Sequence, residues 1–574
     1  MTGLGTSESS RPSAARPGVD WHGASGFPQL KRRFIKDPIW GNVELFEWEK
    51  ELLNHFLINR LHSIVQNSGA FRVYPGLKYS RFCHTVGVLH VATEIFVNVV
   101  LNSDEAGLSQ LRSEAVRADR ICEPPAKEML HQTMPRFIRC VPDYAVLLAF
   151  TRVGALLHDI GHLPYSHVFE RALHGFLLKH SVRDVTATGP VDGEATLRGL
   201  KEWYADASTR GQKLHELLGE RFSRLFAEEF SSEPGRSVVR GAVALLHEGD
   251  WPAAKSILVG PMDADRIDFV RRDTTFSGLQ DTAVDSGRLF ACYELSEYGD
   301  GPEHRWGVRP NRRGTSEGEK LIWERFQDYK YIISHHKVHF FDEVLERLII
   351  RLLEDGSLDS FLSDLHGLIF AEHPSTLNDR VKTVMLLKSI LLKFDDPWLD
   401  VSLREAYVRA AERHDDSSKL FVRLFEGLSE KRDFFKTAFK RDEDFYGTYR
   451  EIYPEILRPA LRQAVVMSLQ TLKYRIEAET HEKFGRIVVV GDRASKAQHG
   501  LQDEETAAFF GVGELQDFLT RKMRQAALFN VWVDSPINSE VGDCKDLLKF
   551  VAERTMNYVE EAVLKQPRLP ITND

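Results

Sequence analysis

The residues best suited to chemistry lie together between Leu156 and Glu170, in the segment L-L-H-D-I-G-H-L-P-Y-S-H-V-F-E. This segment holds three histidines and two acids. Imidazole nitrogens and carboxylate oxygens together bind divalent ions such as iron, manganese, zinc or magnesium, and neutral imidazole is the commonest protein ligand. The segment therefore predicts a metal site.

The doublet His158–Asp159 carries this prediction. Neighbouring residues on a regular helix point in different directions. At the last turn of a helix, however, both can face one ion if Gly161 takes the left-handed conformation that ends many helices. A histidine such as His162, taken alone, is more often a satisfied polar residue at a helix end.

Two predicted helices must position these side chains. Pro142 and Asp143 open the segment Y-A-V-L-L-A-F-T-R-V-G-A-L-L, which is apolar on nearly every side, as is typical of a central helix. A new turn at Pro164 then lets His167 and Glu170, three residues apart, face each other on the next helix. A neighbouring carboxylate raises the pKa of a histidine toward working pH, which suits proton donation.

Two further segments carry polar residues at helical spacing. After a turn at Pro75, Arg81 and His84 lie three residues apart and share one face of a predicted helix. An acidic face is usually solvated, but alternating apolar residues favour burial in the segment G-P-M-D-A-D-R-I-D-F-V-R-R-D. Its face consists of Asp265, Asp268, Phe269, Arg272 and Asp273.

Composition limits the class of protein. The 574 residues are 43% hydrophobic and 28% charged with a net charge of −9, which is ordinary for a soluble globular protein and disfavours broad nucleic-acid binding. No stretch offers the roughly 18 unbroken apolar residues of a membrane span. The five cysteines are odd in number and scattered, which indicates a reducing compartment. We expect a cytoplasmic protein without an export signal.

The chain predicts a mostly α-helical fold in three parts. Residues 1–27 are rich in Ser, Pro and Gly and predict a disordered tail. Residues 28–354 form the predicted core, with a loop-rich insertion or lid near 103–140 and another insertion near 180–211. Residues 355–574 form a helical C-terminal region that ends in a small α/β lobe, because R-I-V-V-V-G-D and F-N-V-W-V-D are typical of short strands.

Four segments extend the doublet into a longer pattern, over roughly residues 34–345: D-P-I-W-G-N-V-E-L, Y-P-G-L-K-Y-S-R-F-C-H-T-V-G-V, H-D-I-G-H-L-P-Y-S-H-V-F-E and M-D-A-D-R-I-D-F-V-R-R-D. This pattern resembles the deoxynucleoside triphosphate triphosphohydrolases of the HD superfamily, which include bacterial dGTPases and the vertebrate enzyme with a sterile-alpha-motif domain. The resemblance implies a helical metallohydrolase core that cuts a dNTP at the α-phosphorus and releases deoxynucleoside and tripolyphosphate.

The resemblance also implies roles for individual residues. A first divalent ion (Fe, Mn or Zn) would be held by His84, His158, Asp159 and Asp265. A second ion, Mg or Mn, would lie on the triphosphate. His167, braced by Glu170, would protonate the departing 5′ oxygen, with His162 and His215 completing the hydrogen-bond network.

Substrate and effector contacts follow from the same resemblance. Arg81, Arg266 and Lys337 would hold phosphate oxygens, and Gln66 and Asp273 would meet the sugar 3′ hydroxyl. Phe269, Asn67 and Ser334 depart from the vertebrate pattern in the sugar pocket, so the selectivity for deoxyribose over ribose stays open. Such enzymes often form tetramers or hexamers switched on by nucleotides, and the resemblance assigns one allosteric pair to Asp285 and Arg288.

Three functions remain at this point. The first is an oligomeric dNTP triphosphohydrolase that lowers the nucleotide pool, with an antiviral (antiphage) role. The second is an HD phosphohydrolase or phosphodiesterase acting on another nucleotide. The third is a catalytically silent nucleotide-sensing regulator, against which the full set of ligands and a candidate acid argues.

Overall fold

The structure is a computed structural model. It describes residues 33–137, 141–179, 192–209, 213–229, 234–249, 251–260, 262–279, 284–298, 305–370, 377–429, 434–492, 526–534 and 544–565. The predicted disordered tail 1–27 lies outside the described residues. The described chain is mostly helical, as predicted, with short antiparallel strands.

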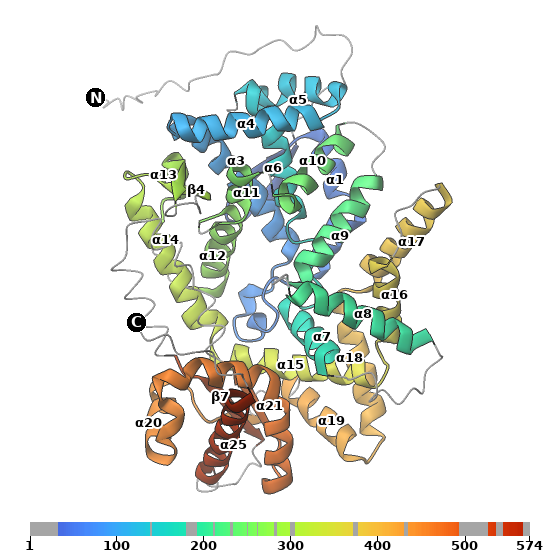
Figure 1. Ribbon diagram of the computed structural model, residues 1–574, viewed down its shortest axis with the longest axis vertical. Coiled ribbons are helices and arrows are strands. Elements are labelled where there is room, and N and C mark those ends of the chain that lie inside the picture. Colours follow the sequence, from blue (N-terminus) through green and yellow to red (C-terminus); the bar gives the residue numbers. More distant parts are fainter. Residues whose placement is uncertain are drawn as a thin grey trace, which may run out of the picture.

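Two long apolar helices form the centre of the larger unit (Figure 1). Helix α6, Ala145–Leu157, is buried along its whole length, as its apolar sequence predicts. Helix α3, Arg81–Asn102, packs against it and starts at the predicted residue. Helices α10 (Gly235–His247) and α12 (Ala264–Ser277) pack against α6 and α3 respectively.

The chain enters this unit through a hairpin and a series of short helices. Strands β1 and β2 pair in antiparallel register, with Ile35 opposite Val43. The bounds are β1 Arg33–Asp37, β2 Gly41–Leu45, α1 Glu47–Leu53, α2 Phe56–Asn59, η1 Arg60–Ser63, η2 Ala70–Arg72 and η3 Pro75–Leu77.

Residues 103–140 correct the prediction of a loop-rich segment. They form α4 (Glu105–Ile121) and α5 (Pro124–Phe137), and both helices pack against α6. Pro124 and Pro125 stand in the first turn of α5, where a proline loses no backbone hydrogen bond, and Pro135 lies inside the helix near its end. In the second predicted insertion, residues 180–191 lie outside the described residues and α8 (Asp192–Thr209) is helical.

The remaining elements of the larger unit surround the central helices. A second hairpin, β3–β4, packs against α3 and α11, and a π-helical segment, η6, lies between α14 and α15. The bounds are η4 Pro142–Tyr144, α7 His167–Lys179, α9 Leu214–Glu229, α11 Pro252–Leu258, α13 Ser286–Ala291, β3 Tyr293–Tyr298, β4 Arg305–Pro310, α14 Thr315–Gln327, η6 Asp328–Ile333, α15 His336–Glu354, α16 Asp359–Ile369, α17 Leu377–Lys393, α18 Asp396–Ala411 and α19 Asp416–Ser429.

The C-terminal lobe contains the two strands that the sequence predicted. Strands β6 and β7 pair antiparallel, and the sheet order is β5-β7-β6. Helices α21 and α25 pack against each other beside this sheet (Figure 1). The bounds are β5 Phe435–Thr437, α20 Asp442–Ile452, η7 Pro454–Leu457, η8 Pro459–Leu461, α21 Arg462–Phe484, β6 Val488–Asp492, β7 Phe529–Asp534 and α25 Cys544–Lys565.

Two large buried clusters divide most of the described core. The larger one runs from Val43 through α19 to Phe435 and includes Val489 and Trp532 of the lobe strands, and the other lies within the lobe, between Phe439 and Val559. The predicted division at residue 354 stays a prediction, but the larger core continues past it through α16–α19. Helix α15 joins the two parts, because it contacts both α7 and β6.

Helix α3 is apolar and long enough to cross a membrane, alone among the helices of the described chain. Its apolar window is 67% buried inside the protein. It also carries the buried imidazole of His84. These features are those of a core helix, in keeping with the prediction of no membrane span.

Candidate metal centre and histidine cluster

Three of the four predicted metal ligands meet at one point. The ligand atoms of His84, His158 and Asp265 all lie within 4.8 Å of one another, although α3, α6 and α12 supply them separately. His84 Nε2 lies 2.9 Å from Asp265 Oδ1, and His158 Nε2 lies 3.9 Å from the same oxygen. The Asp265 side chain is 37% exposed, so the group is open to an incoming ligand on that side.

The two imidazoles are oriented for metal binding. His158 Nδ1 lies 2.7 Å from the Ala155 carbonyl oxygen, which fixes the proton on Nδ1. His158 Nε2 is then a buried acceptor, and it has no hydrogen-bond partner. A buried nitrogen lone pair that faces a carboxylate and a second imidazole fits a divalent ion of the Fe, Mn or Zn class.

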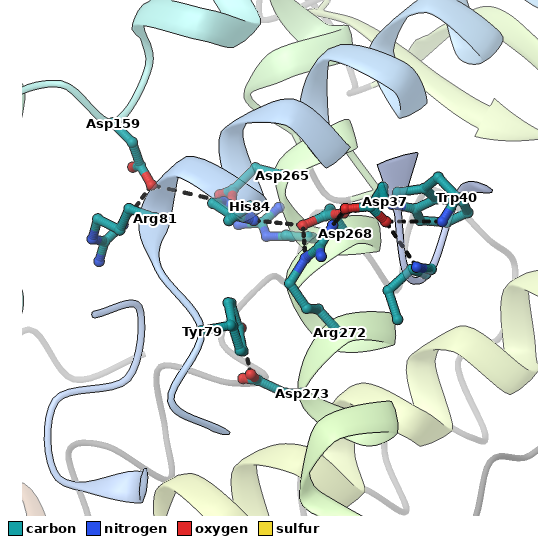
Figure 2. A network of polar contacts seen from close by, with 12 residues as sticks. Asp37, Trp40, Tyr79, Arg81, His84, Asp159, Asp265, Asp268, Arg272 and Asp273 are labelled. Carbon is teal, nitrogen blue, oxygen red and sulfur yellow. Dashed lines mark hydrogen bonds and ion pairs between the residues drawn. The ribbon is translucent and has the colours of Figure 1, made fainter. Parts of the chain in front are cut away.

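Asp268 holds the other side of His84 (Figure 2). Its Oδ2 lies 2.7 Å from His84 Nδ1 and accepts a hydrogen bond from Arg272 Nε at 2.9 Å, while its Oδ1 accepts from Trp40 Nε1 at 2.5 Å. A carboxylate behind a ligating histidine fixes its ring orientation and increases its basicity. Desolvation lowers the pKa of His84, but Asp265 and Asp268 more than offset it and raise the pKa to about 10. The pocket therefore favours a positive charge.

Asp159 links this pocket to the rest of the site. It forms an ion pair with Arg81, and its oxygens lie 3.5 Å from His158 Nε2 and 3.7 Å from His84 Nε2. Burial opposes ionisation, yet Arg81 and the histidines keep the pKa of Asp159 well below its usual range. Arg81 also donates a hydrogen bond to Ser166 Oγ at 2.8 Å. The guanidinium predicted to bind phosphate is therefore hydrogen-bonded to protein groups in this structure.

Glu170 forms the hub of a second cluster. Its carboxylate lies 3.1 Å from His162 Nδ1, 3.2 Å from His167 Nδ1 and 2.9 Å from His215 Nδ1. The rings of His162 and His215 stack at a centroid distance of 4.3 Å. Asp159 Oδ1 lies 3.3 Å from His162 Nε2 and connects the cluster to the metal pocket. The structure thus brings the four predicted catalytic residues together.

The charges in this cluster differ from the prediction at one residue. Desolvation lowers the pKa of His167 to about 4, and Glu170 only opposes that shift, so the expectation of a raised pKa is wrong. Because 58% of the side chain is exposed, water makes the shift smaller than full burial would produce. Burial works against the charge of Glu170, but the three histidines hold its pKa well below the usual range.

The turn between the two clusters has an unusual backbone. Tyr165 and Ser166 have φ angles of 53° and 54°, in the left-handed region that favours glycine. Such strained residues persist only where the surrounding structure holds them, and they gather at functional sites. Gly161, in contrast, is not among the described residues with positive φ, so its predicted left-handed conformation is wrong.

Gly161 is required for close packing instead. A Cβ atom at this position would lie 2.0 Å from the His215 carbonyl oxygen and 2.3 Å from the Gly219 nitrogen. The backbone after the doublet therefore touches α9, the helix that carries His215. This contact sets the distance between the HD turn and the last member of the histidine cluster.

Sequence reasoning missed Asp396, which holds the strained turn in place. Its Oδ1 accepts from the Tyr165 backbone nitrogen at 2.6 Å, and its Oδ2 accepts from the Val65 nitrogen at 2.8 Å. The Tyr165 hydroxyl donates to Asp400 at 2.8 Å, from the same helix α18. No local pattern marks these contacts, since the partners lie 231 and 331 residues away.

The predicted sugar contacts gather beside the metal pocket but are engaged within the protein. The Asp273 carboxylate accepts from Asn67 Nδ2 at 2.7 Å and from the Tyr79 hydroxyl at 2.5 Å (Figure 2). The Gln66 backbone nitrogen bonds the Tyr79 carbonyl oxygen, and its side-chain oxygen is buried without a hydrogen bond. Of the polar face predicted to be buried on α12, Asp268, Arg272 and Asp273 are buried, whereas Asp265 and Phe269 are half-buried.

The other predicted substrate residues lie on neighbouring elements. Arg266 and Phe269 are half-buried on α12, and Lys337 is half-buried in the first turn of α15. Their contacts with a phosphate or a sugar remain predictions. The pair Asp285 and Arg288 has a structural role, because the Asp285 side chain accepts from the Arg288 backbone nitrogen at 3.0 Å and caps α13.

Comparisons with known proteins give distant relatives. No protein-family model matches the chain. An uncharacterised protein of Methanocaldococcus jannaschii is 22% identical over 66% of this chain and 65% of that protein. The deoxynucleoside triphosphate triphosphohydrolase SAMHD1 of Bos taurus is 24% identical over 44% of this chain and 36% of that protein. The same enzyme of Danio rerio is 26% identical over 43% and 34% respectively.

The chain thus spans about two thirds or less of the length of each of these relatives. Among solved structures, a phosphohydrolase from Bacteroides thetaiotaomicron superposes with a TM-score of 0.45 at 17% identity, over 71% of this chain and 78% of that chain.

Proposed function

We propose that the protein is a metal-dependent nucleotide phosphohydrolase whose substrate is a dNTP and whose products are deoxynucleoside and tripolyphosphate. One observation carries this proposal. The metal pocket of His84, His158 and Asp265 adjoins the histidine cluster on Glu170, and Asp159 contacts both groups. The named activity of the bovine and zebrafish relatives supports the choice of substrate.

The pocket supplies what phosphoryl chemistry requires. A divalent ion held by His84, His158, Asp159 and Asp265 would neutralise phosphate charge and lower the pKa of a water. Asp268 and the Ala155 carbonyl fix the two imidazoles, so the ligands need little reorganisation when the substrate binds.

The cluster supplies the proton. As the oxygen of water adds to the α-phosphorus, the bond to the 5′ oxygen breaks and this oxygen takes a proton. His167 is the exposed member of the cluster, with 58% of its side chain accessible, while His162 and Glu170 are enclosed behind it. The negative charge of a bound triphosphate would favour the protonated imidazole and counteract the lowered pKa of His167.

The product identifies the reaction. The Mn²⁺-loaded protein is incubated with each dNTP and each NTP, singly and mixed, and the phosphate products are separated by ion exchange. We expect tripolyphosphate from a dNTP. Pyrophosphate or single phosphate would contradict cleavage at the α-phosphorus by water and would favour an HD phosphohydrolase of another specificity.

A further inference from the structure

The histidine cluster has the composition and spacing of a metal site of its own. His162, His167, His215 and Glu170 each offer a ligand atom, and these four atoms lie within 4.8 Å of one another. In a tetrahedral zinc site with ligand distances of about 2.0–2.1 Å, neighbouring ligand atoms lie roughly 3.3 Å apart. His167 Nδ1 and His215 Nδ1 lie 3.2 and 2.9 Å from Glu170 Oε2, close to this edge length, and His162 Nδ1 lies 3.1 Å from Oε1.

All three imidazoles turn the same atom toward the carboxylate. In each histidine it is Nδ1 that approaches Glu170. His167 and His215 approach the same oxygen, Oε2, and His162 approaches Oε1. Convergence of three like nitrogens on one carboxylate group is an arrangement that suits a nitrogen-rich metal site.

A second observation points to a missing ligand. His162 Nδ1 and Glu170 Oε1 are buried and 3.1 Å apart, yet neither atom makes a hydrogen bond. The two residues are 2% and 8% exposed, so bulk water does not satisfy these atoms. Buried polar atoms are nearly always hydrogen-bonded, so this couple, an ion pair without a hydrogen bond, points to an ion that both atoms would bind from one side.

We propose that His162, His167, His215 and Glu170 form a second metal site, selective for zinc-class ions and separate from the pocket of His84 and His158. Three nitrogens and one oxygen favour Zn²⁺ or Co²⁺ over Mg²⁺ or Ca²⁺. Binding there replaces the Nδ1 protons. An ion on Nδ1 therefore prevents His167 from forming the imidazolium that would protonate a leaving group, and it acts as an inhibitor.

Co²⁺ binding tests the site without any substrate. Equilibrium dialysis of the full chain against Co²⁺ is combined with the visible spectrum, in which tetrahedral nitrogen–oxygen coordination gives intense bands. We expect two equivalents in the wild type. Glu170→Gln, which keeps the shape of the side chain, and His215→Ala should each lose the tetrahedral equivalent, with affinity reduced by at least the roughly 100-fold that loss of an outer partner costs.

The matched variant is His158→Ala, which should lose the other equivalent and keep the tetrahedral spectrum. Zinc X-ray absorption on the wild type supplies a readout that does not depend on variant folding, and it should show three imidazoles at the second zinc. A single Co²⁺ equivalent in the wild type, or a tetrahedral equivalent that survives in both Glu170→Gln and His215→Ala, would overturn the proposal.

This proposal stands apart from the proposed hydrolysis, because metal stoichiometry is measured without nucleotide. If both hold, added Zn²⁺ inhibits the Mn²⁺-loaded enzyme and a chelator selective for zinc restores the rate. Two Co²⁺ equivalents without any dNTP hydrolysis would leave the second site standing and remove the proposed substrate.

Discussion

At the scale of single residues, the proposed reaction needs one histidine as a metal ligand and another as the proton donor. His158 and His167 lie nine positions apart, but one points a bare nitrogen into the metal pocket and the other is exposed beside Glu170. Both are histidines in one short segment, and the structure gives them the different surroundings that their predicted roles require. Their different surroundings lead to different expected effects of substitution.

His167→Ala should keep the first metal and dNTP binding while turnover falls by about two to four orders of magnitude, the usual effect of losing a general acid. Glu170→Gln should lose less, because the acid remains. Single-turnover rates and Mn²⁺ content of the same samples check both outcomes. If His167→Ala strips the Mn²⁺, the residue is a ligand of the first site, and His215 becomes the candidate acid.

Gly161→Ala should displace α9 and with it His215, because the new Cβ would lie 2.0 Å from a backbone oxygen. We expect a loss of about 1–3 kcal/mol in the free energy of unfolding, the cost of overpacking, together with reduced turnover. Gly447→Ala is the matched control: it lies within helix α20 with nothing within 4 Å, and should be neutral or slightly stabilising. Urea unfolding measures the free energy of unfolding of both variants. An unchanged value for Gly161→Ala would contradict the close contact with α9.

At the scale of elements, the site depends on a helix outside the predicted core. Helix α18 contributes Asp396, which bonds two backbone nitrogens and fixes the strained turn before His167. The sequence predicts residues 355–574 as a helical region that ends in a small α/β lobe, with no candidate site residue in it. Asp396 positions the turn before His167 through hydrogen bonds to the backbone.

Asp396→Ala should lower turnover by at least about tenfold while the first metal stays bound, because small displacements of catalytic groups are costly. Glu405→Ala on the same helix is the control, since its side chain is 67% exposed in a surface pair with Arg409. Rates and Mn²⁺ content are compared in the two variants. Equal rates would show that the turn before His167 holds its shape without Asp396.

The residue types of the HD doublet predicted a metal site, and the structure brings three of the four predicted ligands together, while their binding of an ion stays a prediction. Asp265 could be placed with His84 only by resemblance, since the two lie 181 residues apart. Asp396 and Asn67 could not be predicted, because their partners are backbone nitrogens and a distant carboxylate. The helices α4 and α5 were missed since polar faces and prolines hid the buried stripe of Leu111, Ala115 and Ala118.

At the scale of the whole molecule, a buried charge cluster joins the C-terminal lobe to the larger unit. Lys473 of α21 lies 2.7 Å from Glu343 and 2.8 Å from Glu346 of α15. Arg171, on the same helix α7 as His167, bonds Glu346 at 2.9 Å. The lobe is thereby connected through one helix to the element that carries the proposed acid.

Lys473→Met should cost about 3–5 kcal/mol in the free energy of unfolding, because it removes the cation that two buried carboxylates share and leaves Glu343 with Arg347 and Glu346 with Arg171. Arg475→Met, whose side chain is 63% exposed in a pair with Glu479, should change stability by less than about 1 kcal/mol. Urea unfolding followed by circular dichroism measures both. Similar small effects in the two variants would contradict a stabilising role for the cluster.

The same cluster sets a pH dependence. Burial opposes ionisation, but Lys473 and its neighbours lower the pKa of Glu346 to about 2. Its contribution to stability is therefore complete above the unfolded pKa of about 4.3 and disappears as the pH falls toward 2. Burial raises the pKa of Asp396 to about 7. Its contribution to the free energy of unfolding therefore decreases as the pH rises from about 4 to 7, opposite to that of Glu346. The difference between wild type and Lys473→Met isolates the cluster, and it should shrink below about pH 4.

The claim that the HD doublet holds the catalytic ion is tested most directly by measuring bound Mn²⁺ and dNTP turnover on the same preparations. The double variant His158→Ala/Asp159→Ala should lose one Mn²⁺ equivalent and all measurable turnover. The control removes another histidine–aspartate pair, His131 and Asp119, which lie 3.0 Å apart with about a quarter of each side chain exposed; this double alanine variant should keep both. A doublet variant with full Mn²⁺ content and normal turnover would contradict the assignment.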